Sequence, residues 1–212
     1  MNPSGSEWLD IFDENKTLIG VATRDEAHEQ GLWHLSAHVW VVTLHKGRPA
    51  LLFQKRSMAK KVYPGMLDGS CAGHVPSGET SLGTALRELN EEIGIHARAA
   101  DLRYAGEHID TSLSQDLVNC EFCETYFYGT DRDPSTFRLQ PEEVAGLIAM
   151  PLDVGPQLFS GDMERITVPA YHLAEDTVTV QYADFARRPR NYYTRLFLVA
   201  ERFLRGEHHL GF

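Results

Sequence analysis

The sequence has few cysteines, fewer basic than acidic residues, and no long apolar run. Its three cysteines, Cys71, Cys120 and Cys123, are too few and too unevenly spaced for a disulfide framework. Twenty lysines and arginines against 30 aspartates and glutamates give a formal net charge of −10, which argues against a general nucleic-acid binder. No segment approaches the roughly 20 apolar residues that cross a bilayer, and residues 1–7 lack the basic and apolar regions of a secretory signal. We therefore expect a cytoplasmic enzyme with reduced thiols and with neither a nucleic-acid nor a membrane partner.

What the chain does contain is an ordinary globular composition, with 42% hydrophobic and 24% charged residues. Its 212 residues fit one domain with a modest appendage. We place the domain at residues 1–150, including an N-terminal hairpin, and a C-terminal extension packed on it at residues 151–212. The acidic balance does not exclude a small phosphorylated substrate, because a bound divalent cation reverses the local sign of charge.

Apolar periodicity and β-branched content predict the secondary structure. The predicted strands cover residues 8–12, 18–21, 33–44, 50–55, 70–74, 102–109, 117–128 and 178–180, with a further apolar stretch at 146–150. The predicted helices cover residues 80–93, 152–159 and 192–205, whereas residues 24–30 fit either a helical turn or a loop. This irregular alternation favours an α+β fold or a mixed sheet between helices.

The most informative segment is residues 73–95. Glu88, Glu91 and Glu92 fall within a sector of roughly 100° of the predicted helix. Carboxylates this close repel by a few tenths of a kcal/mol per exposed pair, and a hard cation with oxygen ligands relieves that repulsion. Arg87 lies four residues before Glu91 and can pair with it. A solvated acidic face is the ordinary explanation of such a helix, but the coinciding glycine, arginine and glutamate spacings favour a cation site.

Residues 73–95 resemble the Nudix box, G-x5-E-x7-R-E-U-x-E-E-x-G-U with U an aliphatic residue, at every specified position. The order of the surrounding strands also resembles the Nudix fold. The resemblance implies an α/β/α sandwich and a pyrophosphohydrolase that cleaves a nucleoside diphosphate linked to another moiety. The ligands that it implies for Mg²⁺ or Mn²⁺ are Glu88, Glu91, Glu92 and Gly73.

In this implied mechanism the site neutralises charge on the leaving group and positions a water for attack. Either Glu88 or a carboxylate from a neighbouring loop takes the proton of that water. The candidate catalytic residues are Glu88, Glu91 and Glu121.

Residues 54–65 resemble the segment that precedes the Nudix box in isopentenyl-diphosphate isomerases and their hydrolase-like relatives. In those isomerases the residues matching Arg56 and Lys60 contact the diphosphate, and paired cations near a metal-charged site suit a dianionic ligand. A surface role is the ordinary alternative for either cation. We expect Arg56 and Lys60 to bind the substrate, together with His74.

The isomerases also hold a metal through histidines and glutamates. His34 and His74 fall where two of those histidines lie, and His28 is a third candidate with its spacing shifted by one residue. Imidazole is a good ligand for such metals, although a lone histidine on a strand is more often a satisfied core residue. Glu121 matches the acid/base glutamate of the isomerases, and an exposed strand glutamate is the alternative.

One residue departs from the isomerase pattern. The isomerase cysteine immediately precedes the glycine matched by Gly73, and here that position is Ala72. Cys71 lies one position earlier, so on an extended strand it faces the opposite side. Cys120 and Cys123 likewise point to opposite sides of their strand, which argues against a redox or zinc pair. Hydrolysis is therefore favoured over isomerisation.

Residues 151–212 carry no readable motif. We expect the basic cluster at residues 187–190 to be a solvated loop. The aromatic residues of the predicted helix at 192–205 either pack on the sheet or form a homodimer surface. Three functions stay open: a Mg²⁺-dependent hydrolase, an isomerase-like enzyme, and a catalytically silent module that binds a diphosphate. The intact glutamates weigh against the third, since a silent module has no need of mutually repelling carboxylates.

Overall fold

The computed structural model describes residues 7–114, 117–189 and 191–212. Its strands are β1 (Trp8–Phe12), β2 (Leu18–Thr23), β3 (Trp33–His45), β4 (Arg48–Arg56), β5 (Leu67–Asp68), β6 (Cys71–His74), β7 (Leu102–Ser114), β8 (Leu117–Gly129), β9 (Val144–Pro151), β10 (Arg165–Tyr171) and β11 (Thr177–Gln181). Its α-helices are α1 (Arg24–Gln30), α2 (Ser81–Ile93), α3 (Gly155–Ser160) and α4 (Tyr192–Leu204). None of the described helices is long and apolar enough to cross a membrane.

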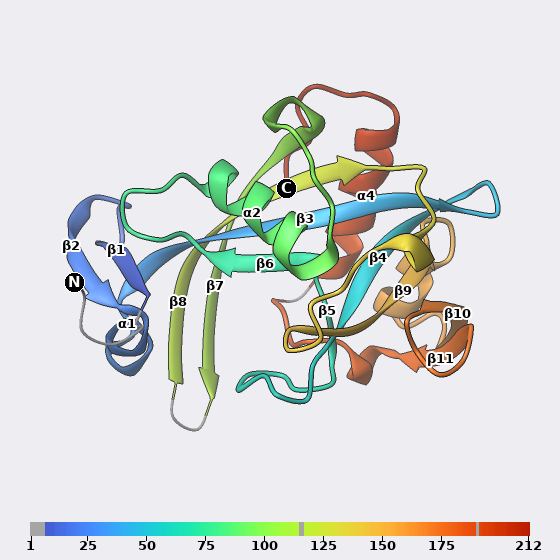
Figure 1. Ribbon diagram of the computed structural model, residues 1–212, viewed down its shortest axis with the longest axis horizontal. Helices are drawn as coiled ribbons and strands as arrows, with labels where there is room; N and C mark the ends of the chain where they lie inside the picture. Colours follow the sequence, from blue (N-terminus) through green and yellow to red (C-terminus); the bar gives the residue numbers. More distant parts are fainter. Residues whose placement is uncertain (1–6, 115–116, 190) are drawn as a thin grey trace.

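The strands build a mixed sheet around β3. The order is β11-β10-β9-β4-β3-β1-β2, with β6 and β8 also paired to β3 and with β7 paired to β8. Strand β3 runs antiparallel to β4 and β6 but parallel to β8. In Figure 1, α2 lies in front of β3 and α4 lies behind it. The expected mixed sheet between helices is confirmed.

Helix α2 is fixed at both ends and along one face. The Thr80 side chain caps its start by accepting a hydrogen bond from a backbone N–H of the first turn. Gly94 ends it in the left-handed conformation, with φ of +68°, which glycine adopts without a Cβ penalty. Leu89 and Ile93 are fully buried in one core cluster with Val39 of β3. The helix is therefore held in one orientation against the sheet.

Strand alternation gives the sheet around β3 two different faces. Ala37 and Val39 point toward α2 and belong to its apolar cluster. The alternate residues of β3, including Ser36 and His38, point the other way, and the register of β6, β7 and β8 places further polar side chains beside them. We call this set the polar face; it consists of His34, Ser36, His38, His74, His108, Asp110, Glu121, Cys123 and Thr125.

The C-terminal segment contacts the polar face at Asp110 and His108 and extends the sheet. Strand β10, which the sequence did not predict, pairs with β9 and β11. The expectation of a solvated loop at residues 187–190 is wrong for Arg188, whose side chain is 10% exposed and pairs with Asp68 and Asp110. The reason is that buried carboxylates are stable only when they are paired. Arg190 lies outside the described residues. The aromatic residues of α4 pack into the core behind β3.

Candidate active site and metal-ligand clusters

The three glutamates of α2 differ in their exposure. Glu88 and Glu92 are buried, with 9% and 5% exposure, while the Glu91 side chain is half exposed. Glu88 and Glu92 are four residues apart and so lie one turn apart on the same side of the helix. The predicted acidic set is therefore two buried carboxylates with a third at the solvent boundary.

Gly73 of β6 contacts the first of these carboxylates. A Cβ atom at Gly73 would overlap the Glu88 carboxylate and would lie 2.9 Å from Glu88 Cγ. No other residue type fits without moving Glu88. The spacing between the glycine and the glutamate thus reflects a direct approach of the strand backbone to the helix side chain.

Arg87 joins two of the carboxylates. Its Nη1 lies 2.7 Å from Glu88 Oε1 and 3.1 Å from Glu91 Oε2. The pairing of Arg87 with Glu91 agrees with the four-residue spacing. Burial raises the pKa of Glu88, which Arg87 opposes and Glu91 reinforces.

Glu92 has the more extreme environment of the two buried glutamates. Gln54 of β4 donates a hydrogen bond to its Oε2 at 3.1 Å. Burial, followed by the charges of Glu88 and Glu143, raises the pKa of Glu92 well above its usual range. The nearby cations Lys60 and Arg56 lower the pKa of Glu92 but only partly offset this rise.

Arg56 and Lys60 lie beside this acidic group, each already engaged. Arg56 Nε donates to the Val62 carbonyl at 3.0 Å, and its Nη1 is 3.5 Å from Asp68. Lys60 Nζ forms an ion pair with Glu143. Both cations influence Glu92, so they are within electrostatic reach of the α2 carboxylates.

The polar face carries a second group of ligand-type side chains. Ligand atoms of His28, His34, His74 and Glu121 all lie within 4.8 Å of one another. His28 comes from α1, and its ring centroid is 5.1 Å from those of His34 and His74. All three histidines named from the sequence therefore converge with Glu121, including His28 despite its shifted spacing.

The hydrogen bonds of His34 define which of its nitrogens faces Glu121. Nδ1 lies 2.8 Å from the Leu32 carbonyl, which only accepts, so Nδ1 carries the proton in the neutral ring. The other nitrogen, Nε2, is buried, has no hydrogen-bond partner among the described residues, and lies 3.6 Å from Glu121 Oε1. His74 Nε2 is 3.4 Å from the same oxygen.

Glu121 is ionised in this environment. Burial alone would raise its pKa, but His34 and His74 hold the pKa of Glu121 well below its usual range. A lone pair on His34 Nε2 facing a carboxylate is unfavourable unless a proton or a cation lies between them. The donor set of imidazole nitrogens and one carboxylate suits a divalent transition metal.

The cysteines occupy the positions expected from strand alternation. Cys71 pairs with Val39 in register and is buried in the apolar cluster of α2. Ala72 pairs with His38 on the polar face. No thiol therefore stands at the position of the isomerase cysteine.

Two groups of functional-type residues were not singled out from the sequence. Glu143, in the loop before β9, reaches Glu92 only through the fold, and an isolated acidic pair in a loop gives no signal of that. His38 and His108 lie on the polar face with Cys123. Alternation along β3 and β7 predicts the side that each histidine faces, but only the pairing of both strands with β8 shows that the two histidines meet.

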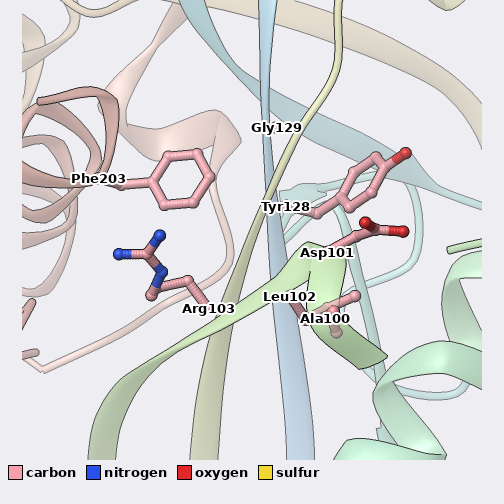
Figure 2. Close-up of a pocket in the computed structure, with 7 residues that line it drawn as sticks. All are labelled: Ala100, Asp101, Leu102, Arg103, Tyr128, Gly129 and Phe203. Atoms are coloured by element: carbon pink, nitrogen blue, oxygen red, sulfur yellow. The ribbon is translucent and has the colours of Figure 1, made fainter. Parts of the chain in front are cut away.

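A cavity elsewhere in the molecule contains neither group. It has a volume of about 360 Å³ and lies between the start of β7, the end of β8 and α4. Figure 2 shows Arg103 and Phe203 on one side of this cavity, with Asp101 and Tyr128 on the other. It holds no cluster of carboxylates or histidines, so the chemistry points to the α2 glutamates instead.

Comparison with known proteins shows which proteins this chain resembles. The NUDIX domain profile matches residues 12–167. An uncharacterised Nudix hydrolase of Clostridium acetobutylicum is 41% identical over 147 residues, which cover 69% of this chain and 71% of that protein. The uncharacterised Nudix hydrolase YfcD of Escherichia coli K12 is 33% identical over 142 residues, which cover 67% of this chain and 72% of that protein.

Solved structures give the same fold. The crystal structure of DR0079 from Deinococcus radiodurans has a TM-score of 0.57 and 25% identity, over 74% of this chain and 88% of that chain. A MutT/nudix family protein from Enterococcus faecalis has a TM-score of 0.53 with 11% identity, over 83% of this chain and 64% of that chain, and so resembles it in fold alone. The expected α/β/α sandwich is confirmed.

Proposed function

This chain belongs to the Nudix hydrolase family, whose members act on phosphoanhydride bonds, and we propose that it is a Mg²⁺-dependent pyrophosphohydrolase. Its substrate would be a nucleoside-diphosphate-type or related small molecule that contains a diphosphate linkage. The observation that carries the proposal is the pair of buried glutamates on α2, one of them in contact with the Gly73 backbone.

The residues around α2 fit a hard divalent cation. Mg²⁺ prefers oxygen donors, and carboxylate oxygens are offered here by Glu88, Glu91 and Glu92. The backbone of Gly73 lies directly beside the Glu88 carboxylate. Two of these carboxylates are buried with too little positive charge beside them. A bound cation would supply that charge and would offset charge developing on the transferred phosphate. Mn²⁺ satisfies the same donors.

The remaining residues have roles that follow from their contacts. Arg87 holds Glu88 and Glu91 in place through its two ion pairs. Gln54 orients Glu92. We assign Arg56 and Lys60 to the diphosphate, which would exchange with their partners Asp68 and Glu143.

Two carboxylates are candidates for the general base. Glu88 is one, because burial raises its pKa toward the range in which a base is effective at neutral pH. Glu143 is the other, since it belongs to a neighbouring loop and its charge contributes to raising the pKa of Glu92. Once a diphosphate binds Lys60, Glu143 would be free to accept a proton from water.

An isomerase-like activity is a second candidate, supported by the convergence of His28, His34, His74 and Glu121 on the polar face. Against it stands Ala72, which supplies no proton at the position of the isomerase cysteine. Cys71 does not replace it, because its side chain lies in the α2 core. Glu121 and His74 belong to this candidate chemistry rather than to the α2 cluster.

The deciding experiment is a substrate screen with Mg²⁺ that covers nucleotide sugars, nucleoside di- and triphosphates, dinucleotides and prenyl diphosphates. We expect cleavage of a diphosphate-linked compound, complete loss with a chelator, and a large loss in Glu92→Gln. Glu142→Gln, an exposed neighbour of Glu143, is the control and should retain activity.

Failure to cleave any diphosphate, with metal binding unchanged in Glu92→Gln, would refute the hydrolase proposal. Incorporation of solvent deuterium into isopentenyl diphosphate would establish the isomerase-like candidate instead. Tight diphosphate binding without turnover would identify a silent binding module.

A further inference from the structure

A second cluster of ligand-type side chains lies deeper on the polar face, away from the α2 glutamates. His108 of β7 and Cys123 of β8 are directly paired in register. His38 of β3 pairs with Thr125, the next residue along β8 on this face. Ligand atoms of His38, His108 and Cys123 all lie within 4.8 Å of one another. Three adjacent strands thus present two imidazoles and one thiol to a single point.

One ligand atom of the cluster is buried without a partner among the described residues. His108 Nδ1 lies 3.4 Å from Thr125 Oγ1, while Nε2 is buried without a hydrogen-bond partner in the described chain. The Cys123 thiol donates to Glu121 Oε2 at 3.4 Å, and this side chain is fully buried. His38 is 4% exposed. A buried nitrogen without a hydrogen-bond partner destabilises the folded state, and a bound ligand at His108 Nε2 would relieve that penalty.

The two histidines are in the protonation state that binds a metal, whereas burial raises the pKa of the Cys123 thiol, so a cation must displace its proton. Burial lowers the pKa of His38, and burial with the charge of His38 lowers the pKa of His108 to about 2, so both rings are neutral. Neutral imidazole is the form that ligates metals. The guanidinium of Arg188 contributes to lowering the pKa of both histidines, and its charge is offset by ion pairs with Asp68 and Asp110.

The size of the cluster is close to that of a zinc site. Ligand atoms around a tetrahedral ion with bonds of ~2.0–2.3 Å lie ~3.3–3.8 Å apart. Separations of up to 4.8 Å therefore need side-chain movements of only about 1 Å. A set of two nitrogens and one sulfur favours Zn²⁺ over Mg²⁺, which prefers oxygen.

We propose that His38, His108 and Cys123 form a binding site for a Zn²⁺-like divalent ion. The site is separate from the α2 glutamates and from the cluster of His28, His34 and His74. On binding, the Cys123 sulfur exchanges its proton for a bond to the metal, and the proton is released to solvent. Three protein ligands would leave a fourth tetrahedral position for another donor, and Glu121 Oε2 lies 3.4 Å from the Cys123 sulfur.

Glu121 connects this site to the other histidine cluster on the polar face. Its Oε1 faces His34 and His74, and its Oε2 faces Cys123. One carboxylate thus borders both histidine clusters. An ion at the deeper site would fix the orientation of Glu121 toward the shallower one.

Cobalt provides a direct test, because a thiolate bound to Co²⁺ gives a near-ultraviolet charge-transfer band that oxygen and nitrogen ligands do not. The full-length chain is stripped with a chelator and titrated with Co²⁺. We expect such a band at one equivalent for this site, its removal by excess Zn²⁺, and its loss in Cys123→Ser. His108→Ala should weaken cobalt binding by roughly 10-fold or more.

The matched control is the double variant Cys71→Ser/Cys120→Ser, which leaves Cys123 as the sole cysteine and should keep the band. This variant also answers the objection that Cys123→Ser fails to fold. His28→Ala should keep the band as well, because it belongs to the other cluster. Absence of a thiolate band in the wild-type chain, or its loss in the double variant, would overturn the proposal. The wild-type chain would lack the band if His108 served only to pack against the rings of Tyr192 and Phe212.

Discussion

The two faces of the sheet beside β3 carry opposite chemistry. On the α2 face, a helix presents carboxylates to one backbone glycine, and the rest of the contact is apolar. On the polar side, histidines from α1, β3 and β6 converge on Glu121, and the C-terminal segment packs on His108 and pairs with Asp110. The α2 face offers oxygen donors for a hard cation, whereas the polar face offers nitrogen and sulfur.

The difference shows how each face is held together. The α2 carboxylates belong to one helix, so their spacing is fixed by local hydrogen bonding and survives changes elsewhere. The polar face is assembled from four strands and a distant arginine, so it depends on tertiary pairing. Mutations should therefore separate activity on the first face from stability on the second.

The largest effect is expected at Arg188. Arg188→Met would leave Asp68 and Asp110 buried without their cation, and such a loss costs about 3–5 kcal/mol in the free energy of unfolding. Urea denaturation of the metal-free protein measures it. Arg187→Met, at an exposed neighbouring position, should change stability by less than about 0.5 kcal/mol. Equal stability of the two variants would contradict this account of the polar face.

Glu92→Gln should have the next largest effect, and its main effect should be on activity. Removing this proposed metal ligand should forfeit several kcal/mol of charge stabilisation, or roughly 10²–10³-fold in kcat/KM. Steady-state hydrolysis of the substrate from the screen, with Mg²⁺ varied, measures it. His28→Gln on the other face should leave the Mg²⁺ dependence of activity unchanged. An equal loss of activity in His28→Gln would contradict the separation of the two sites.

Gly73→Ala tests the contact between β6 and α2. The added methyl would displace Glu88, and a misplacement of about 1 Å costs up to about 10²-fold in rate. Gly69→Ala is the control, because its Cβ would make only ordinary contacts with Trp40 at 3.5 Å and beyond. Rates for the two variants, each checked for folding by circular dichroism, decide the point; full activity of Gly73→Ala would remove the structural reason for the glycine.

The smallest effect is a difference in pH dependence between the faces. His108, with a pKa of about 2 against an ordinary 6.5, binds fewer protons folded than unfolded, so its contribution to stability is lost as pH falls below 6.5. Glu92 has the opposite sign: its raised pKa keeps a proton that the unfolded chain releases above 4.5, so its contribution is lost as pH rises.

Urea unfolding of the metal-free protein between pH 5 and 8 checks these signs. Glu92→Gln should remove the decline on the alkaline side, and His108→Gln should remove the decline on the acid side. If both variants changed stability on the same side of the pH profile, the opposite pH dependences assigned to the two faces would be wrong.

The sequence by itself determined the α2 side almost completely. Thr80, Gly94 and the spacing of Leu89 and Ile93 predict the helix, and the glutamate spacing predicts which carboxylates share its surface. The reason is that a helix repeats every 3.6 residues, so neighbours in space are neighbours in sequence. The hairpin of β1 and β2 was predictable for the same local reason.

Only the tertiary structure decided the polar face. The convergence of His38 with His108, 70 positions later, depends on the parallel pairing of β3 with β8 and the antiparallel pairing of β8 with β7. Strand alternation predicts which side a residue faces but not which strand lies next to it. The same limit hid the burial of Arg188 and the approach of Glu143 to Glu92, because each joins groups far apart in the chain through packing alone.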